Sequence, residues 1–291
     1  MLLVLALLLA APAVPASRLV VGLASPLGPE RAKADARLLA AHLTTALGRT
    51  VEARPYDTPD ELASALTSGR VDVGWLTPIA YVRATRQLKL APLLKAVRRG
   101  HDYYLSALFV RADSGIARLS QAAGKKVAWV RGGSATGYVY PLAFFKRHKV
   151  DPDLYFARPA LGADDHKAEC ELVLSGKADV GATFADAEPT SDWRALDGCI
   201  ESVGEAEAKK LLPIEVLDRP IPSDVIVARP GLPMDDAKAL AGALVALATD
   251  DAGRKLLAEL FHAERLVPAS DDDFGPVREA EELALGKAAA K

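Results

Sequence analysis

The sequence contains few of the residues that mark metalloproteins and disulfide-rich proteins. Only two cysteines, Cys170 and Cys199, occur in 291 residues. No His-Glu-x-x-His or Cys-x-x-Cys motif is present, so neither of those zinc sites is indicated. Two cysteines form no framework pattern, so a disulfide in an oxidising compartment and two separate buried thiols both remain open.

An excess of basic residues is also missing. Lysine and arginine number 36 against 38 aspartates and glutamates, which gives a formal net charge of −2. Nucleic-acid binding needs a basic surface that replaces counterions at the phosphates. The composition therefore predicts no nucleic-acid partner, although it allows one locally basic pocket.

The sequence lacks the glycine-rich signatures of nucleotide-binding and hydrolytic enzymes. Its glycine-rich loop, residues 132–137 (GGSATG), is followed by no Gly-Lys-Ser/Thr and is not a P-loop. The loop also lacks the Gly-x-Ser-x-Gly spacing of a nucleophile elbow. No Gly-x-Gly-x-x-Gly follows the first expected strand, Leu19–Leu23, which argues against dinucleotide binding. These absences favour a binding protein without a cofactor over an enzyme.

Long apolar runs are confined to the start of the chain. Met1–Ala10 is too short to span a bilayer, and the segment Val14-Pro15-Ala16 fits the small-x-small rule for cleavage after Ala16. No lysine or arginine precedes the run, which is atypical of a signal peptide. A buried first strand is the alternative, but Leu19–Leu23 fits that role better. We therefore expect residues 1–16 to be a signal peptide, without a lipid anchor because no cysteine lies near the cleavage point.

Patterns typical of strands and helices alternate through the rest of the chain. Such alternation predicts parallel sheets with helices on their faces. The first unit has expected strands at 19–23, 51–54 and 71–76, with helices at 30–47 and from residues 58 and 78. Extended segments precede a second unit, with expected strands at 126–130 and 178–183 and helices at 138–148 and 165–174. Two such units predict two α/β lobes with a ligand cleft between them.

The glycine-rich loop is the clearest candidate for a binding element. It lies between an expected strand and an expected helix, so its glycines allow a ligand to approach closely and the helix offers unpaired N–H groups. The hydroxyls of Ser134 and Thr136 add neutral donors. This pattern fits a tetrahedral oxyanion. The alternative is a plain capped turn, in which the hydroxyls satisfy backbone donors.

Other candidate site residues each have a simple structural alternative. His166 opens an expected helix, where it would either donate to an oxyanion or be an exposed first-turn residue. Tyr81, Tyr103 and Tyr104 fit either an apolar cleft wall or the core. Asp186 follows an expected strand, where it would bind a ligand amine or a protonated ligand oxygen, or be a surface carboxylate.

Seven segments, spread over nearly the whole chain after residue 16, share their order and spacing with one known family. They are residues 70–81 (RVDVGWLTPIAY), 104–111 (YLSALFVR), 124–130 (GKKVAWV), 134–138 (SATGY) with Pro141, His166, 176–182 (GKADVGA) and 220–224 (PIPSD). Together they resemble the phosphate/phosphite/phosphonate-binding family of ABC-transporter periplasmic proteins. Each motif is modest, and the set is specific through its order.

The resemblance implies a type II periplasmic binding protein, an α/β fold whose two lobes close on a ligand. Lobe one is expected at residues 18–108 plus 223–291, and lobe two at 109–222. The implied function is capture of a small oxyanion (a phosphonate, phosphite or phosphate) in the periplasm for an ABC-transporter permease, by a protein expected to be monomeric. The implied ligand-binding residues are Tyr81, Tyr104, Ser134, Ala135, Thr136, Gly137 and His166, with Asp186 as a looser match.

The chain departs from the family at one position of the loop. The family sequence is usually Ser-Thr-Ser-Gly, whereas Ala135 stands here at the second position, so one hydroxyl donor is missing. A hydrogen bond to a charged group contributes about 1.5–3 kcal/mol, so its loss corresponds to about tenfold or more in affinity. Arg131 would compensate if it reaches the cleft; otherwise the ligand differs from a phosphonate.

Two other functions remain open at this stage. The same fold would also serve as a ligand-sensing module for a membrane signalling partner. An enzyme that uses the same cleft is the third hypothesis, but the sequence contains no recognisable nucleophile–base pair to support it.

Overall fold

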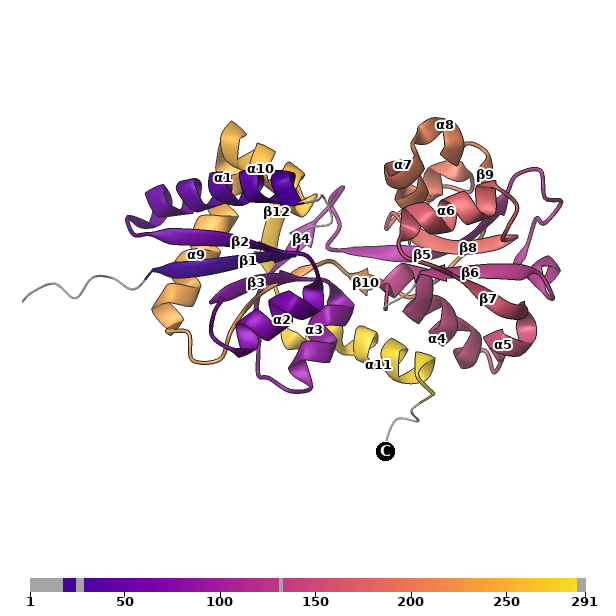
Figure 1. Cartoon of the computed structure of the whole chain (residues 1–291), viewed down its shortest axis with the longest axis horizontal. Helices are drawn as coiled ribbons and strands as arrows, with labels where there is room; N and C mark the ends of the chain where they lie inside the picture. The colour runs from indigo at the N-terminus through magenta and orange to yellow at the C-terminus, as the bar shows by residue number, and fades with distance from the viewer. Residues whose placement is uncertain (1–17, 25–28, 131–132, 287–291) are drawn as a thin grey trace, which may run out of the picture.

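A computed structural model describes residues 18–24, 29–130 and 133–286. It shows two lobes, each built around a six-stranded sheet with helices on both faces (Figure 1). The expected signal peptide lies outside the described residues. Among those residues, no helix is both long and apolar enough to cross a membrane.

The first lobe surrounds a sheet with the strand order β12-β4-β11-β3-β1-β2. Its strands are β1 (Leu19–Ala24), β2 (Val51–Tyr56), β3 (Val73–Leu76), β4 (Ala91–Val97), β11 (Val225–Ala228) and β12 (Arg265–Pro268). Its helices are α1 (Pro29–Leu47), α2 (Pro59–Thr67), α3 (Pro78–Thr85), α9 (Met234–Ala246) and α10 (Asp251–Phe261). In β1, Leu19 and Val21 pack under α1, α9 and α10, while Val20 packs under α2 and α3. Helices therefore bury both faces, as a parallel β1–β2–β3 arrangement requires.

The second lobe surrounds a sheet with the order β10-β5-β8-β6-β7, in which β9 also pairs with β5. Its strands are β5 (Tyr103–Arg111), β6 (Lys126–Val130), β7 (Ala157–Ala163), β8 (Val180–Ala185), β9 (Leu211–Val216) and β10 (Ile221–Pro222). Its helices are α4 (Tyr140–Arg147), α5 (Pro152–Tyr155), α6 (His166–Leu174), α7 (Asp197–Val203) and α8 (Glu205–Ala208). A disulfide between Cys170 and Cys199 joins α6 to α7, which decides between the two states that the sequence left open.

The boundary expected after Leu108 falls inside β5 and needs correction. All of β5 pairs in the second sheet, with β8 on one side and with β9 and β10 on the other. Residues 106–110 are buried as a result, so the strand cannot be divided between two cores. The change of sheet instead takes place in the turn between β4 and β5.

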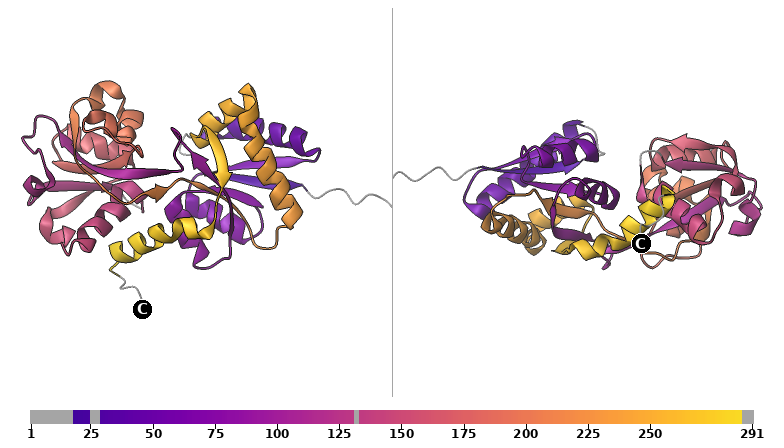
Figure 2. Two further views of the ribbon diagram at one scale, coloured as in Figure 1. Left: turned by 180° about the vertical axis from the view of Figure 1, so that it is seen from behind. Right: turned by 90° about the horizontal axis from the view of Figure 1, so that it is seen from below.

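Two short segments and one helix connect the lobes. The chain crosses between the sheets at residues 98–102 and again at 223–224, where the Ser223 N–H donates to the Asp102 carbonyl at 2.9 Å. The last helix, α11 (Gly275–Ala284), packs against both α3 and α4. It lies along one side of both lobes in the views from the front and from below (Figures 1 and 2). One hydrophobic core runs from α3 through α11 into α4, so apolar packing holds the lobes together on this side.

Candidate ligand-binding site

A cavity of about 1010 Å³ lies between the two lobes. Its walls come from residues just beyond the carboxyl ends of β2, β3, β6, β7 and β8, and from both crossing segments. Open α/β sheets bind ligands at this edge because loops from several strands converge there. We name two regions of the cavity: the loop end contains Ser134, Thr136, His166 and Arg83, and the hinge end contains Arg98, Arg99, Asp186, Asp197 and Asp224.

The loop end begins with a capped helix start. A turn of π-helix, Ala135–Val139, runs directly into α4, and the Ser134 hydroxyl caps it by accepting from the Gly137 N–H at 3.0 Å. A Cβ on Gly137 would lie 2.5 Å from Cγ2 of Val130 and 3.0 Å from Cε1 of His166. Glycine at this position therefore allows the loop to pack against β6 and the histidine. First-turn N–H groups lack intrahelical acceptors, which makes such a start suitable for an anion.

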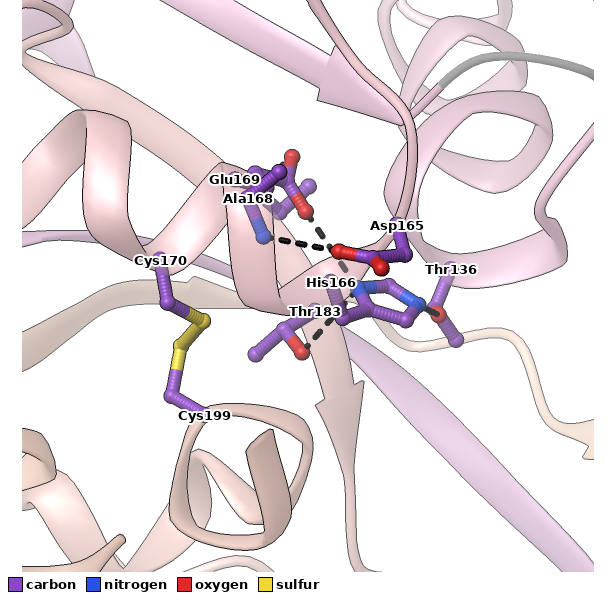
Figure 3. Close-up of a disulfide and its surroundings, with 9 residues drawn as sticks. Thr136, Asp165, His166, Ala168, Glu169, Cys170, Thr183 and Cys199 are labelled. Atoms are coloured by element: carbon purple, nitrogen blue, oxygen red, sulfur yellow. Dashed lines mark hydrogen bonds and ion pairs between the residues drawn. A yellow bond between two sulfur atoms is a disulfide. The ribbon is translucent and has the colours of Figure 1, made fainter. Parts of the chain in front are cut away.

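His166 is the first residue of α6, and its ring lies against the loop (Figure 3). The helix begins here because the Asp165 side chain accepts from the Ala168 N–H at 2.8 Å. Nε2 of His166 lies 3.3 Å from the Ser134 hydroxyl and 3.2 Å from the Thr136 hydroxyl. Three polar groups that the sequence predicted for the site thus meet at one point, where they can bind one oxyanion.

The opposite ring nitrogen of His166 faces a buried carboxylate that sequence reasoning missed. Nδ1 lies 3.3 Å from Oε2 of Glu169, and the Thr183 hydroxyl lies 3.3 Å from the same nitrogen. The Glu169 side chain is fully buried, and its Oε1 accepts from the Ala182 N–H at 2.9 Å. Burial raises the pKa of Glu169 to about 7, although the bond to His166 opposes the increase. The i, i+3 spacing on one helix was the available signal for this pair.

The position of one proton between His166 and Glu169 determines whether Nε2 of His166 is a hydrogen-bond donor or an acceptor. If the carboxyl group holds the proton, it donates to Nδ1, and the neutral ring then has its hydrogen on Nε2. If the ring holds it, both ring nitrogens are donors. In both arrangements Nε2–H of His166 points towards the loop, where it can donate to an acceptor. If the proton is lost, Nδ1–H donates to the Glu169 carboxylate, and Nε2 becomes an acceptor that opposes an anion.

At the hinge end, the arginines that line the cavity are paired with acids. Nη1 of Arg99 donates to Asp186 at 2.6 Å and to Asp197 at 2.8 Å. Arg98 donates to Asp224 at 2.8 Å. Burial tends to raise the pKa of Asp186, but the bond from Arg99 outweighs it and the pKa is lowered. Asp186 therefore lines the cavity as predicted, but its partner is an arginine of the chain.

The two predicted tyrosines have different positions. Tyr104 lines the cavity, where burial and then the charge of Asp224 raise its pKa well above the ordinary value, so the phenol stays neutral. Tyr81 does not line the cavity, which corrects the prediction. It is fully buried against Phe274, and its hydroxyl donates to Asp271 at 2.5 Å. Segments of the chain near residue 270 cover this face of α3, so Tyr81 belongs to the core of the first lobe.

The remaining loop positions are also accounted for. Ala135 lines the cavity and is buried, and the Thr136 carbonyl accepts from the Ser106 hydroxyl at 2.8 Å, which fixes the loop to β5. Arg131, expected to compensate for Ala135, lies outside the described residues. Arg83 lines the cavity, and sequence reasoning did not single it out.

Within residues 18–24, 29–130 and 133–286, no group of three histidines, cysteines or acids could hold a metal ion.

A family model described as "ABC transporter, phosphonate, periplasmic substrate-binding protein" matches residues 21–274. The chain belongs to this family. A curated relative, the phosphate-import protein PhnD of Mycolicibacterium smegmatis, is 30% identical over 132 residues. That alignment covers 42% of this chain and 41% of the relative, so the match spans about two-fifths of that protein's length.

Solved structures with low sequence identity share the fold. A binding protein component of an ABC phosphonate transporter from Pseudomonas aeruginosa matches with a TM-score of 0.72 at 20% identity, over 94% of this chain and 89% of that one. PhnD1 of Prochlorococcus marinus in complex with methylphosphonate matches with a TM-score of 0.72 at 17% identity, over 93% and 99%. The periplasmic aliphatic sulphonate binding protein SsuA of Escherichia coli has a TM-score of 0.62 at 13% identity, over 93% and 87%. The fold is that of a type II periplasmic binding protein.

Proposed function

We propose that this family member captures a small phosphorus oxyanion, a phosphonate, phosphite or phosphate, in the periplasm and delivers it to an ABC-transporter permease. One observation supports the ligand class above all others: the hydroxyls of Ser134 and Thr136 each lie within 3.3 Å of Nε2 of His166, at a helix start inside the cavity between the lobes. Neutral donors and a helix N-terminus suit a small anion. PhnD, PhnD1 and the Pseudomonas aeruginosa component are named for phosphate or phosphonates, whereas SsuA is named for aliphatic sulphonates.

The proposed mechanism is closure of the lobes around the ligand. The oxyanion binds at the loop end and contacts the first lobe, so it binds the closed form more tightly and shifts the population towards that form. Residues 98–102 and 223–224 are short enough to serve as the hinge. No step of chemistry is required, and we propose a monomer as the functional unit.

Export completes the proposal. Residues 1–16 would direct the chain to the periplasm and then be removed. The disulfide between Cys170 and Cys199 supports this location, because disulfides form and persist in oxidising compartments.

A thermal-shift screen of the exported protein tests the ligand class. The panel contains phosphate, phosphite, methylphosphonate, sulfate and methanesulfonate. A ligand that binds only the folded state, present at a hundredfold excess over Kd, adds about 2.7 kcal/mol of stability. We expect a clear rise in Tm with one or more phosphorus oxyanions. No response to any member of the panel would overturn the proposed ligand class.

Thr136→Val then tests the loop as the binding element. The substitution removes a buried hydroxyl while keeping the shape of the side chain, so we expect binding to weaken by about fivefold or more in calorimetry. Thr85→Val, on α3 and outside the cavity lining, is the matched control and should leave the affinity unchanged. Equal affinities of both variants would exclude Thr136 as a ligand.

A further inference from the structure

The hinge end of the cavity contains a cation that belongs to the chain itself. Nη1 of Arg99 donates to Oδ2 of Asp186 at 2.6 Å and to Oδ1 of Asp197 at 2.8 Å. All three residues line the cavity. The bonds to Asp186 and Asp197 raise the pKa of Arg99 above its ordinary value, so the guanidinium keeps its charge. Two carboxylates therefore hold one positive group inside the proposed ligand cavity.

The two carboxylates come from separate elements of the second lobe. Asp186 directly follows β8, and Asp197 is the first residue of α7. Their side chains are only 20% and 8% exposed. Burial raises the pKa of Asp197, the bond from Arg99 opposes this increase, and the charge of Asp186 adds to it. Two partly buried carboxylates that share one nitrogen require a cation between them, because an unpaired buried charge is costly.

The turn between β4 and β5 carries Arg99 to this pair. Arg98 and His101 exchange backbone hydrogen bonds at 2.8 and 2.9 Å across the turn. Arg99 has φ 48, and Gly100 follows with φ 83. Glu264 of the first lobe accepts from the N–H groups of both residues, at 3.0 and 3.1 Å. The backbone of the turn is thus held by bonds that do not involve the guanidinium.

The shared cation distinguishes the Asp186–Asp197 pair from the other acids at this end. Those acids each lie beside a donor or a positive group: Asp224 with Arg98, Glu264 with the N–H groups of the turn, and Glu201 with His262. An ammonium group that took the place of Arg99 would gain two charge-assisted bonds at one point. With Arg99 in place, the same ammonium group meets a like charge instead.

We propose that Arg99 determines specificity: it occupies the cation position between Asp186 and Asp197 and thereby excludes ligands that have a positively charged tail. This inference rests on the proposed function and narrows its ligand class to oxyanions with a neutral tail or none. The oxyanion binds at the loop end, and a cavity of about 1010 Å³ leaves room for a tail that extends towards the hinge end. The selectivity comes from a repulsive element, since the chain supplies the cation that the ligand must not bring.

Arg99→Gly tests the assignment, because glycine readily adopts the positive φ of this position. The probes are two pairs of ligands with equal shapes, measured by calorimetry: propylphosphonate with 2-aminoethylphosphonate, and pentylphosphonate with 4-aminobutylphosphonate. We expect the wild-type protein to bind the alkyl member of at least one pair about tenfold or more tightly than its amino partner. In that pair, Arg99→Gly should tighten binding of the amino member by about tenfold or more and change binding of the alkyl member much less.

Two further variants show whether the gain comes from the proposed carboxylates. Arg99→Lys keeps a cation at the position and should keep the wild-type preference. The double variant Arg99→Gly/Asp186→Asn removes one carboxylate and should lose most of the gain. Asp60, Asp164 and Asp165 also line the cavity, and an effect that they cause would persist in the double variant.

The outcomes separate this inference from the proposed function. A wild-type protein without the preference, no gain in Arg99→Gly, or a gain that persists in the double variant would overturn the role of Arg99 and leave the proposed function intact. A wild-type protein that binds no phosphonate, phosphite or phosphate would overturn both.

Discussion

The two ends of the cavity use different polar groups. At the loop end, the hydroxyls of Ser134 and Thr136 each lie within 3.3 Å of Nε2 of His166. At the hinge end, Asp186 and Asp197 bond one arginine, Arg99, and Asp224 bonds Arg98. We place the proposed oxyanion site at the loop end, because the arginines of the hinge end already have carboxylate partners.

One disulfide joins the helix of His166 at the loop end to the helix of Asp197 at the hinge end, and its removal gives the largest expected effect. His166 and Glu169 lie on α6, which the Cys170–Cys199 disulfide joins to α7 across a separation of 29 residues (Figure 3). Closing a loop of this length stabilises a fold by about 3–4 kcal/mol in the chain-entropy model. We expect the double variant Cys170→Ala/Cys199→Ala to lose about this much unfolding free energy in urea titrations.

Reducing agent provides the control for the double variant. Wild-type protein unfolded in dithiothreitol should match the variant, and dithiothreitol should leave the variant unchanged. If the reduced and oxidised wild-type proteins unfold at the same urea concentration, the disulfide does not stabilise the fold.

One histidine at each end of the cavity allows a direct comparison. Nε2 of His166 faces the hydroxyls of the loop, whereas His262 lines the hinge end and has φ 46, a conformation that asparagine tolerates. We expect His166→Asn to weaken oxyanion binding by about ten- to a hundredfold, because a charge-assisted donor is lost. His262→Asn should change the affinity by less than about twofold. Calorimetry with methylphosphonate compares them, and similar losses in both variants would place the ligand elsewhere.

The buried pair at the loop end predicts how stability depends on pH. The pKa of Glu169 is raised from 4.5 to about 7 by burial, so the folded state retains a proton that the unfolded state has lost. The stabilising contribution is therefore complete below the ordinary pKa and disappears as the pH rises through about 7. We expect the wild-type protein to lose about 3 kcal/mol of unfolding free energy over this interval.

Glu169→Gln is the matched variant for this pH dependence. Its amide can accept from the Ala182 N–H and donate to Nδ1 of His166 at every pH, so Nε2 keeps its hydrogen. The variant should lack the loss of stability, and its oxyanion affinity relative to wild type should rise above about pH 7. Parallel pH profiles of the two proteins would show that folding does not raise the pKa of Glu169.

Local sequence signals predicted the loop end well. Glycine, serine and threonine before a helix indicated a capped start with donors, and His166 lies at the start of its helix as expected. These features depend on neighbours within a few residues, so the sequence contains the information. The pairing of Glu169 with His166 could also have been predicted from the sequence, because Glu169 lies one helical turn after His166.

Contacts between residues far apart in the sequence determine the side-chain positions that the sequence alone could not predict. Tyr81 and Arg83 are two residues apart on α3, so they point in different directions, and the helix pattern alone does not say which side faces the cavity. Asp271 and Phe274, about 190 residues later, cover the Tyr81 side. Asp186 was likewise predicted to bind the ligand, but its side chain bonds Arg99, which lies 87 residues earlier in the sequence.

The smallest expected effect comes from restoring the missing hydroxyl of the loop. Ala135 lines the cavity, at the position where the resemblance implied a hydroxyl residue. A neutral hydrogen bond contributes about 0.5–1.5 kcal/mol, so Ala135→Ser should tighten methylphosphonate binding by about two- to tenfold. Calorimetry with wild type and variant compares the two affinities, and a weaker complex in the variant would mean that this cavity is shaped for a ligand without that third contact.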